Sequence, residues 1–318
     1  MTPTPSGPAT PAGPATPSWR DRLAGAPISW GVCEVPGWGH QLPAAQVLAE
    51  MSAAGLRATE FGPDGFLPAD PATRAATLAS YGLAAVGGFV PLVLHDPDRD
   101  PMAALAALLP GFTASGAGMV VLAAVSGRDG YEARPELDAA AWRTLCANLD
   151  RAAEVAARYG LRVALHPHVG TVVERPGEVR RVLDGCMIPV CLDTGHLLVG
   201  GAHPLDVVRS AVGRVAHVHL KDVDAGLAAR VRAGELGYAE AVAAGLYRPL
   251  GAGDADIAGV VRTLEGAGYA GWYVMEQDRV LPAQRGPRVG RECAEAELGA
   301  AVRADIAAGL AHLAAALA

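Results

Sequence analysis

Short apolar runs alternate along the chain with longer stretches rich in alanine and leucine, from about residue 26 onward. The short runs have the length of buried strands, and the longer stretches have the length of helices. Eight runs are predicted as strands, at 27–33, 57–62, 83–94, 118–125, 161–167, 188–194, 214–220 and 271–278. The predicted helices are 43–54, 70–80, 100–110, 137–159, 176–184, 204–212, 256–267 and 291–317. Eight strands that are each followed by a helix predict an α/β fold, the (β/α)8 TIM barrel.

The residues at the helix ends support this division. In "AGLRAT" (54–59) and "YGLRVA" (159–164) a glycine follows an alanine-rich helix, as a left-handed C-cap requires, and an apolar run begins directly after it. A doubly wound open sheet is the alternative. It would carry a glycine-rich phosphate turn after the first strand, and "SWGVCEVPGWG" (29–39) does not have the GxGxxG spacing. The barrel is therefore favoured.

Length and composition fit one well-buried domain. The chain has 318 residues, of which 51% are hydrophobic and 19% charged, and a TIM barrel typically needs about 250 residues. Residues 1–17, "MTPTPSGPATPAGPATP", have neither the basic nor the apolar region of a signal peptide. We predict a disordered tail over 1–17 and a single barrel domain over 18–318.

Charge and cysteine content exclude several classes of partner. A formal net charge of −7 without a cluster of basic residues argues against nucleic-acid binding. The five cysteines are scattered and odd in number, which indicates reduced core residues in a cytoplasmic protein. No apolar run reaches the roughly 18 residues of a membrane helix. We expect a small-molecule partner.

Two segments suggest further roles. Residues 223–252 form a long insertion after the seventh predicted strand, on the barrel face where loops build active sites, and could act as a lid. The stretch 297–317 is amphipathic and alanine-rich, which predicts core packing or, as the alternative, an interface in a homo-oligomer.

Polar residues close the predicted strands, and in a barrel these positions converge on one mouth. They are Glu60, His166, His168, Asp193, His196, His217, His219, Lys221, Glu276, Gln277 and Asp278. Carboxylates and imidazoles gathered from several strands are the donors that a divalent metal binds. The sequence therefore predicts a metal site.

The two-residue period of a strand narrows the choice of ligands. His217 and His219 point to the same side, and His219 is nearer the carboxyl end, so it is the better ligand, with Lys221 at the rim. His166 and His168 share a face in the same way.

Structural alternatives remain open for several of these residues. A single histidine at a strand end is more often a hydrogen-bonded core residue than a ligand. Asp193 could cap a following helix, and Glu276 could pair with a basic neighbour. Trp30 and Trp38 could belong to the core or could line a polyol pocket.

The segments "APISWGV", "TEFGPDGFLP", "HPHVGTVVE", "CLDTGH", "HVHLKDVD", "PLGAGDADI" and "GWYVMEQD" together carry a resemblance. Over about residues 26–281 the chain resembles the inosose dehydratases of the xylose-isomerase-like sugar isomerase/epimerase superfamily. The resemblance implies one divalent metal, bound by His166, Asp193, His219 and Glu276. Many relatives have glutamate where this chain has His166, and Glu174 or His168 could substitute for it. Two imidazoles and two carboxylates suit Mn²⁺ or Co²⁺, and also Fe²⁺ or Zn²⁺, better than Mg²⁺.

The activity that this resemblance implies is metal-dependent dehydration of a cyclic keto-polyol, such as 2-keto-myo-inositol, through an enolate. Lys221 and His168 are the first candidates for proton transfer, with Glu60 and His196 orienting hydroxyls or supporting the ligands, and Glu174 as a further candidate. The residues expected to contact substrate are Trp30, Trp38, His217, Gln277 and Asp278. The alternative activity is isomerisation or epimerisation of a ketose at the same site. A binding protein without activity would show apolar residues among the four ligand positions, and none of them is apolar.

Overall fold

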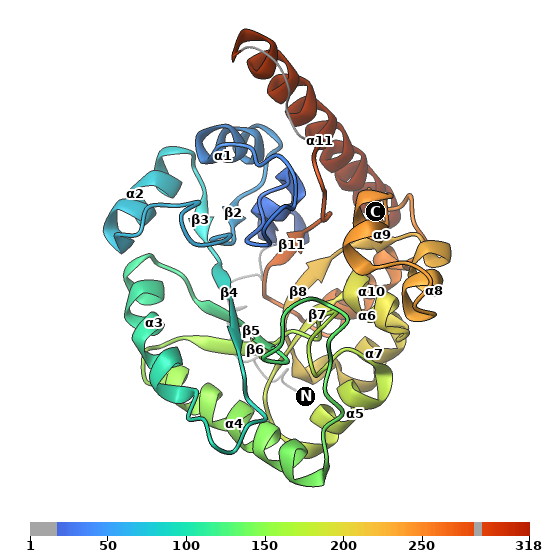
Figure 1. Ribbon diagram of the computed structural model, residues 1–318. Coiled ribbons are helices and arrows are strands. Elements are labelled where there is room, and N and C mark those ends of the chain that lie inside the picture. Colours follow the sequence, from blue (N-terminus) through green and yellow to red (C-terminus); the bar gives the residue numbers. More distant parts are fainter. Residues whose placement is uncertain (1–17, 283–287) are drawn as a thin grey trace, which may run out of the picture.

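A ring of parallel strands surrounded by helices makes up most of the molecule (Figure 1). The structure is a computed structural model and describes residues 18–282 and 288–318, so the tail predicted for 1–17 lies outside the described residues. The strands lie in the order β3-β2-β1-β11-β8-β7-β6-β5-β4. Their bounds are β1 Leu23–Gly25, β2 Ala58–Thr59, β3 Ala84–Ala85, β4 Gly87–Leu92, β5 Met119–Ala124, β6 Arg162–Leu165, β7 Val190–Asp193, β8 Val215–Leu220 and β11 Tyr273–Met275.

Strands β3 and β4 are two parts of one barrel strand, interrupted at Val86. β3 pairs with β2, whereas β4 pairs with β5, so the ring closes through this strand. The Val86 N–H donates to the Thr59 carbonyl (3.0 Å), and the Phe61 N–H donates to the Gly87 carbonyl (2.9 Å). The predicted eight-stranded barrel is confirmed.

The helices predicted from the sequence all form, and their ends lie close to the predicted ones. Gly55 and Gly160 have φ values of 82° and 71°, the left-handed conformation expected of glycines that end helices. The helices are α1 Ala44–Ala53, α2 Pro71–Ser80, α3 Met102–Ala114, α4 Ala139–Ala157, α5 Pro176–Gly185, α6 Thr194–Gly200, α7 Pro204–Ala211, α8 Ala225–Arg232, α9 Tyr238–Ala243, α10 Ile257–Gly266 and α11 Arg288–Ala316.

The prediction for the first strand was wrong. Residues Pro27–Trp30 form a 3₁₀ turn, and the strand lies earlier, at Leu23–Gly25. Pro27 lacks an N–H and has a φ suited to the first turn of a helix, which favours the 3₁₀ turn over a strand. Three residues suffice for β1 because β2 and β11 pair with it on both sides.

The insertion after β8 has secondary structure of its own. β9 (Asp222–Val223) and β10 (Tyr247–Arg248) pair antiparallel, and α8 and α9 lie between them. Asp222 anchors the end of this insertion. Its Oδ2 accepts from the N–H groups of Gly251 (2.8 Å) and Gly253 (3.0 Å), and its Oδ1 accepts from Val223 and Ala255 (both 2.9 Å).

Replacing Asp222 with alanine is expected to destabilise the protein strongly. Four backbone N–H donors, buried or partly buried, would lose a charged acceptor, and a buried donor left unsatisfied costs about 1–3 kcal/mol. We expect a loss of roughly 3 kcal/mol in the free energy of unfolding, measured by urea denaturation. Asp206→Ala, at an exposed aspartate on α7, is the control and should change little. A change for Asp222→Ala as small as that of the control would contradict this role.

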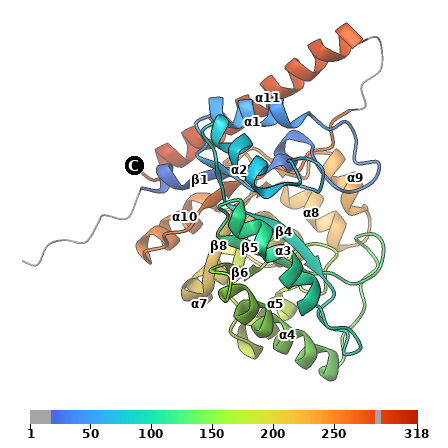
Figure 2. The same cartoon turned by 90° about the vertical axis from the view of Figure 1, so that its left-hand side faces the viewer.

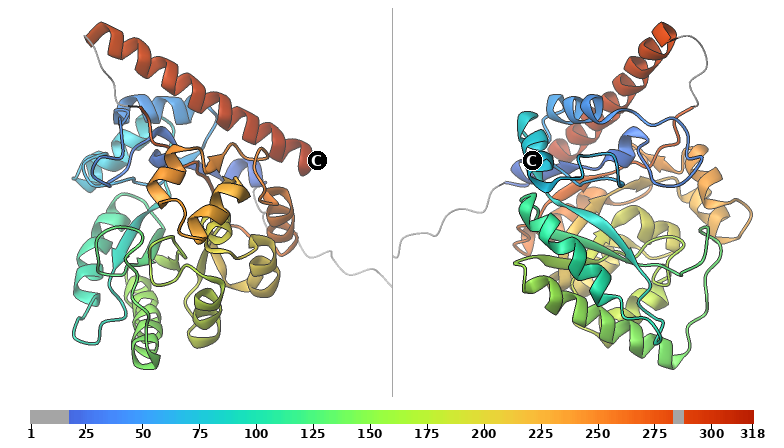
Figure 3. Two further views of the ribbon diagram at one scale, coloured as in Figure 1. Left: turned by 45° about the vertical axis from the view of Figure 1, so that its right-hand side comes forward. Right: turned by 60° about the vertical axis from the view of Figure 1, so that its left-hand side comes forward.

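Helix α11 leaves the ring and runs along α1 (Figures 2 and 3). Glu50 of α1 accepts from the Trp30 indole (2.7 Å) and pairs with Arg303 of α11 (3.0 Å). Val302, Ile306 and Leu313 are buried in the main core, as core packing requires. By length and hydropathy, Glu295–Ala316 could cross a membrane, although 28% of its apolar window is buried inside the protein. Arg303 and Asp305 interrupt its apolar residues, so it is not a continuous apolar run.

Candidate metal and catalytic site

The polar residues that close the strands meet at the carboxyl end of the barrel, as predicted. Glu60, His166, Asp193, His219, Lys221 and Glu276 are all buried. Alternation along the strands places smaller residues one layer below them, Ala58 under Glu60 and Ala164 under His166. The site therefore rests on a packed barrel interior.

Glu60 orients two histidines of β8 at once. Its Oε1 lies 2.7 Å from His217 Nε2 and 2.9 Å from His219 Nε2. Burial alone would raise the pKa of Glu60, but His219 and His217 outweigh it and lower that pKa well below its usual range. A carboxylate here accepts Nε2–H from both rings, so Nδ1 of His219 faces the other carboxylates.

Three donor atoms, from Asp193, His219 and Glu276, surround one position, and His166 lies beside it. His219 Nδ1 lies 3.4 Å from Asp193 Oδ2 and 3.3 Å from Glu276 Oε2, and His166 Nε2 lies 3.5 Å from Asp193 Oδ2. His166 donates its other ring N–H to the Pro167 carbonyl (2.8 Å), which leaves the Nε2 lone pair free. Asp193 Oδ2 and His219 Nδ1 are buried and have no hydrogen-bond partner among the described residues. These atoms fit a divalent cation.

A proton and a metal would compete for His219. Burial alone would lower its pKa, but Cys191, Glu276 and Glu60 together raise the pKa of His219 well above its usual range. The proton gained this way would sit on Nδ1, the atom that a metal would bind, because Nε2 already donates to Glu60.

Lys221 is the one lysine of the sequence, since the other 25 of its 26 basic residues are arginines. Its ammonium group lies 2.8 Å from Glu276 Oε2, 2.9 Å from Asp278 Oδ1 and 3.5 Å from Asp193 Oδ2. Burial alone would lower the pKa of Lys221, but Asp193, Asp278 and Glu276 raise that pKa well above its usual value. The side chain is therefore a buried ammonium ion held by carboxylates.

Negative charge exceeds positive charge in this cluster. Glu60, Asp193, Glu276 and Asp278 contribute four carboxyl groups, whereas Lys221 contributes one permanent cation. Burial raises the pKa of Glu276 to about 7. A divalent cation would restore the balance, which favours its binding.

The rings of His168 and His196 lie beside this position, tilted by 35° to each other, with centroids 3.7 Å apart. His168 donates Nδ1–H to the Val169 carbonyl (2.7 Å), so its Nε2 carries a lone pair. Burial, together with Lys221, lowers the pKa of His168 to about 4. His166, His168 and His196 could also group around a metal. The Lys221 ammonium 3.1 Å from His196 Nε2 disfavours a cation there.

Asp193 caps a helix, which is one of the two interpretations that the sequence left open, and its second carboxylate oxygen has no hydrogen-bond partner among the described residues. Its Oδ1 accepts from the N–H groups of Gly195 and His196 (2.8 Å each) and so caps α6, a helix that the pattern did not predict. Its Oδ2 faces the donor atoms described above. Helix capping fixes the carboxylate in the orientation that a ligand needs.

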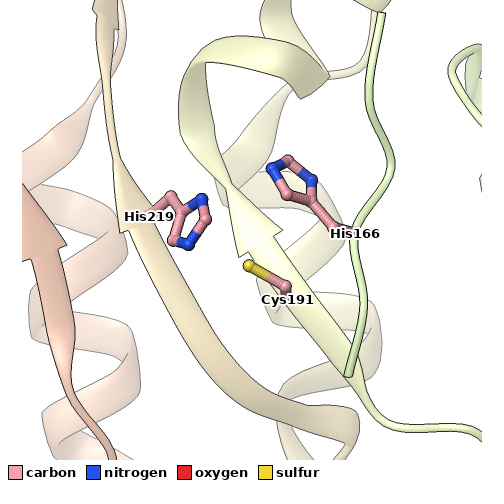
Figure 4. A group of neighbouring side chains, drawn as sticks. All are labelled: His166, Cys191 and His219. Atoms are coloured by element: carbon pink, nitrogen blue, oxygen red, sulfur yellow. The ribbon is translucent and has the colours of Figure 1, made fainter. Parts of the chain in front are cut away.

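Cys191 was predicted only as a reduced core residue. Figure 4 shows its side chain on β7, with His166 and His219 on either side, and the three residues could together hold a metal. Burial raises the pKa of Cys191 to about 11, which keeps the thiol protonated. The alternation that places Cys191 on the same face as Asp193 could have identified it.

Two residues proposed for the site lie elsewhere. Glu174 accepts from the Gly170 N–H (2.7 Å) and pairs with Arg134 (3.2 Å), so it shapes the loop after β6. The interpretation of Trp30 as a pocket wall is corrected, because its fully buried indole donates to Glu50 beneath α1. Core packing is the alternative that applies to it.

The other residues expected to bind substrate have protein partners. His217 bonds to Glu60, and the Trp38 indole donates to the Arg279 carbonyl (2.8 Å). Gln277 donates its amide to the Tyr247 carbonyl (3.2 Å). Asp278 lies against Lys221 and remains at the centre of the site.

Three tyrosines that the sequence did not single out cover the site. Tyr238 and Tyr247 come from the insertion after β8, and Tyr131 comes from the loop after β5. The Tyr131 ring lies 4.6 Å from that of Tyr238 and 6.4 Å from that of His168. The folded insertion brings Tyr238 and Tyr247 to the site, and the loop after β5 brings Tyr131.

A family model described as "Xylose isomerase-like TIM barrel" matches residues 48–294. The chain is 34% identical to the rhizopine catabolism protein MocC of Rhizobium meliloti, over 81% of this chain and 82% of that protein. It is 30% identical to an inosose dehydratase of Geobacillus kaustophilus (strain HTA426), over 81% of this chain and 87% of that protein.

Solved structures have the same fold at lower identity. The structure of an L-ribulose 3-epimerase has a TM-score of 0.63 at 18% identity, covering 93% of this chain and 95% of its own. The IOLI protein with a bound zinc atom has a TM-score of 0.62 at 13% identity, covering 90% and 98%.

Proposed function

The chain belongs to the xylose isomerase-like TIM barrel family, and from this premise we propose that it is a lyase that removes water from a cyclic keto-polyol. The inosose dehydratases among its relatives favour 2-keto-myo-inositol as the substrate class. One observation supports the proposal most directly. A position with the donor atoms of a metal site lies next to an ammonium group and an imidazole lone pair, the two groups that dehydration needs.

His166, Asp193, His219 and Glu276 would hold the metal. When bound, a divalent cation would supply Lewis acidity toward the ketone oxygen of the substrate. Two imidazoles and two carboxylates suit Mn²⁺, Co²⁺, Fe²⁺ or Zn²⁺, and the related IOLI structure holds zinc.

Dehydration needs a base and an acid on neighbouring carbons. We assign the base to His168, whose Nε2 lone pair would accept the proton α to the ketone. We assign the acid to Lys221, which would donate a proton to the departing hydroxyl. The electron pair of the C–O bond leaves with the oxygen, which becomes water. The electron pair left by the α-proton forms the new C=C bond, and the products are an enolic diketone and water.

Glu60 and His196 support these groups. Glu60 fixes the ring of His219 through Nε2, and His196 accepts from Lys221. We further propose a cytoplasmic enzyme whose partner is a small polyol or keto-sugar.

The test is to incubate metal-depleted and Mn²⁺-reconstituted protein with 2-keto-myo-inositol in deuterated water. We expect metal-dependent loss of one water molecule by mass spectrometry, with ultraviolet absorbance from the conjugated product. His168→Ala should lower the rate by about 10²- to 10⁴-fold, whereas His203→Ala, an exposed histidine before α7, should not. Deuterium uptake without loss of water would instead assign the isomerase or epimerase alternative. If the protein neither removes water nor incorporates deuterium, 2-keto-myo-inositol is excluded as its substrate.

A further inference from the structure

Five buried or nearly buried side chains form a closed ring of polar contacts over the strand ends. Lys221 Nζ lies 2.9 Å from Asp278 Oδ1, and Asp278 Oδ2 accepts from Tyr238 Oη at 3.2 Å. Tyr238 Oη lies 2.9 Å from Tyr247 Oη, which lies 3.4 Å from His196 Nδ1. His196 Nε2 returns to Lys221 Nζ at 3.1 Å.

The hydrogens can be assigned consistently around this ring. The Lys221 ammonium group can only donate, so His196 accepts from it at Nε2 and carries its hydrogen on Nδ1. The Val169 N–H also approaches Nδ1, but at 3.4 Å it is longer than the Lys221 contact at Nε2. Nδ1–H then points to Tyr247, Tyr247 donates to Tyr238, and Tyr238 donates to Asp278.

The ring also gives the ammonium group a carboxylate partner, Asp278, besides the two carboxylates at the metal position. Lys221 Nζ lies 2.9 Å from Asp278 Oδ1, 2.8 Å from Glu276 Oε2 and 3.5 Å from Asp193 Oδ2. Tyr238 donates to Asp278 Oδ2 and so orients this carboxylate, whose Oδ1 lies against the ammonium group. The Lys221 ammonium also lies 5.3 Å from the centre of the Tyr247 ring, a cation–π contact.

We infer that Tyr238 and Tyr247 are positioning residues, which hold Asp278 and His196 against Lys221 and so weaken the competition of its ammonium group with a metal for Glu276 and Asp193. The expected effect on kcat rests on the proposed function, in which Lys221 is the acid. The positioning of Lys221 and the effect on metal affinity do not rest on it. If Tyr238 and Tyr247 act in this way, the insertion after β8 positions the side chain of Lys221 as well as covering the site.

The experiment compares Tyr238→Phe and Tyr247→Phe with the wild type and with Tyr273→Phe. Tyr273 is also buried and donates to a carboxylate, Glu265 (2.6 Å), on the core side of the barrel, so it controls for the loss of a buried hydroxyl. Because the chain has a single lysine, protein labelled with nitrogen-15 lysine gives one side-chain signal by NMR, which reports Lys221 directly.

In both ring variants we expect the Lys221 signal to shift and the Mn²⁺ dissociation constant to rise, by roughly 10- to 100-fold, as for other residues that orient metal ligands. kcat should fall while KM changes little, and the control should match the wild type in all three readouts. Wild-type lysine signal, metal affinity and kcat in both variants would overturn the inference. The lysine signal and metal affinity need no substrate, so they test it even if the proposed dehydration fails.

Discussion

Replacing Asp193 with asparagine is expected to abolish metal binding and to lower kcat/KM by about 10³-fold, since the metal contributes several kcal/mol to catalysis. The asparagine keeps an oxygen that can cap α6, where Oδ1 of Asp193 now accepts from two backbone N–H groups. Its amide nitrogen replaces Oδ2 and presents hydrogens where a ligand lone pair is needed. Metal content per chain and initial rates, measured on the same preparation, check this result.

Asp138→Asn is the matched control. Asp138 caps α4 in the same way, through Oδ1 and the N–H groups of Ala140 and Ala141, so the same change is made at a helix start outside the site. Asp193→Ala should also lose the cap, at about 1 kcal/mol of stability. Full metal content and normal rates in Asp193→Asn would exclude Asp193 as a ligand.

The sequence predicted the barrel and most of the candidate site, because both depend on local regularities. The alternation of strands and helices fixes the topology, and the two-residue period of each strand places Glu60, His166 and His219 on the interior face. The strand ends converge in a barrel and bring these residues together, independently of the conformation of the loops. Asp193 shows the limit of this reasoning, because the same carboxylate can cap a helix and face a metal.

Residues that depend on tertiary contacts could not be found in this way. Glu174 lies in the same segment after β6 as His166 and His168, but Arg134, distant in sequence, pairs with its carboxylate and holds it in the loop. Trp30 turns toward Glu50 because a 3₁₀ turn replaces the expected strand. Tyr238 and Tyr247 lie in an insertion whose path over the site is decided by its packing, not by any period in its sequence.

Replacing Lys221 with methionine is expected to separate metal binding from catalysis. The ammonium group is a cation 2.8 Å from Glu276 Oε2 and 3.5 Å from Asp193 Oδ2, so its removal should strengthen Mn²⁺ binding. The proton donor for the departing hydroxyl is lost, which should lower kcat by about 10²- to 10⁴-fold. Titration of Mn²⁺ and steady-state kinetics on the same variant measure both effects.

Stability provides a second readout for Lys221→Met. Without metal, the variant leaves Asp193, Glu276 and Asp278 buried without their cation, and loss of one partner from a buried pair costs about 3–5 kcal/mol. Added Mn²⁺ should therefore raise the thermal midpoint of Lys221→Met more than that of the wild type. Lys221→Arg keeps the charge but has a larger, planar head group, so it should recover stability and not kcat. Weaker Mn²⁺ binding in Lys221→Met would show that the lysine supports the metal position and does not compete with it.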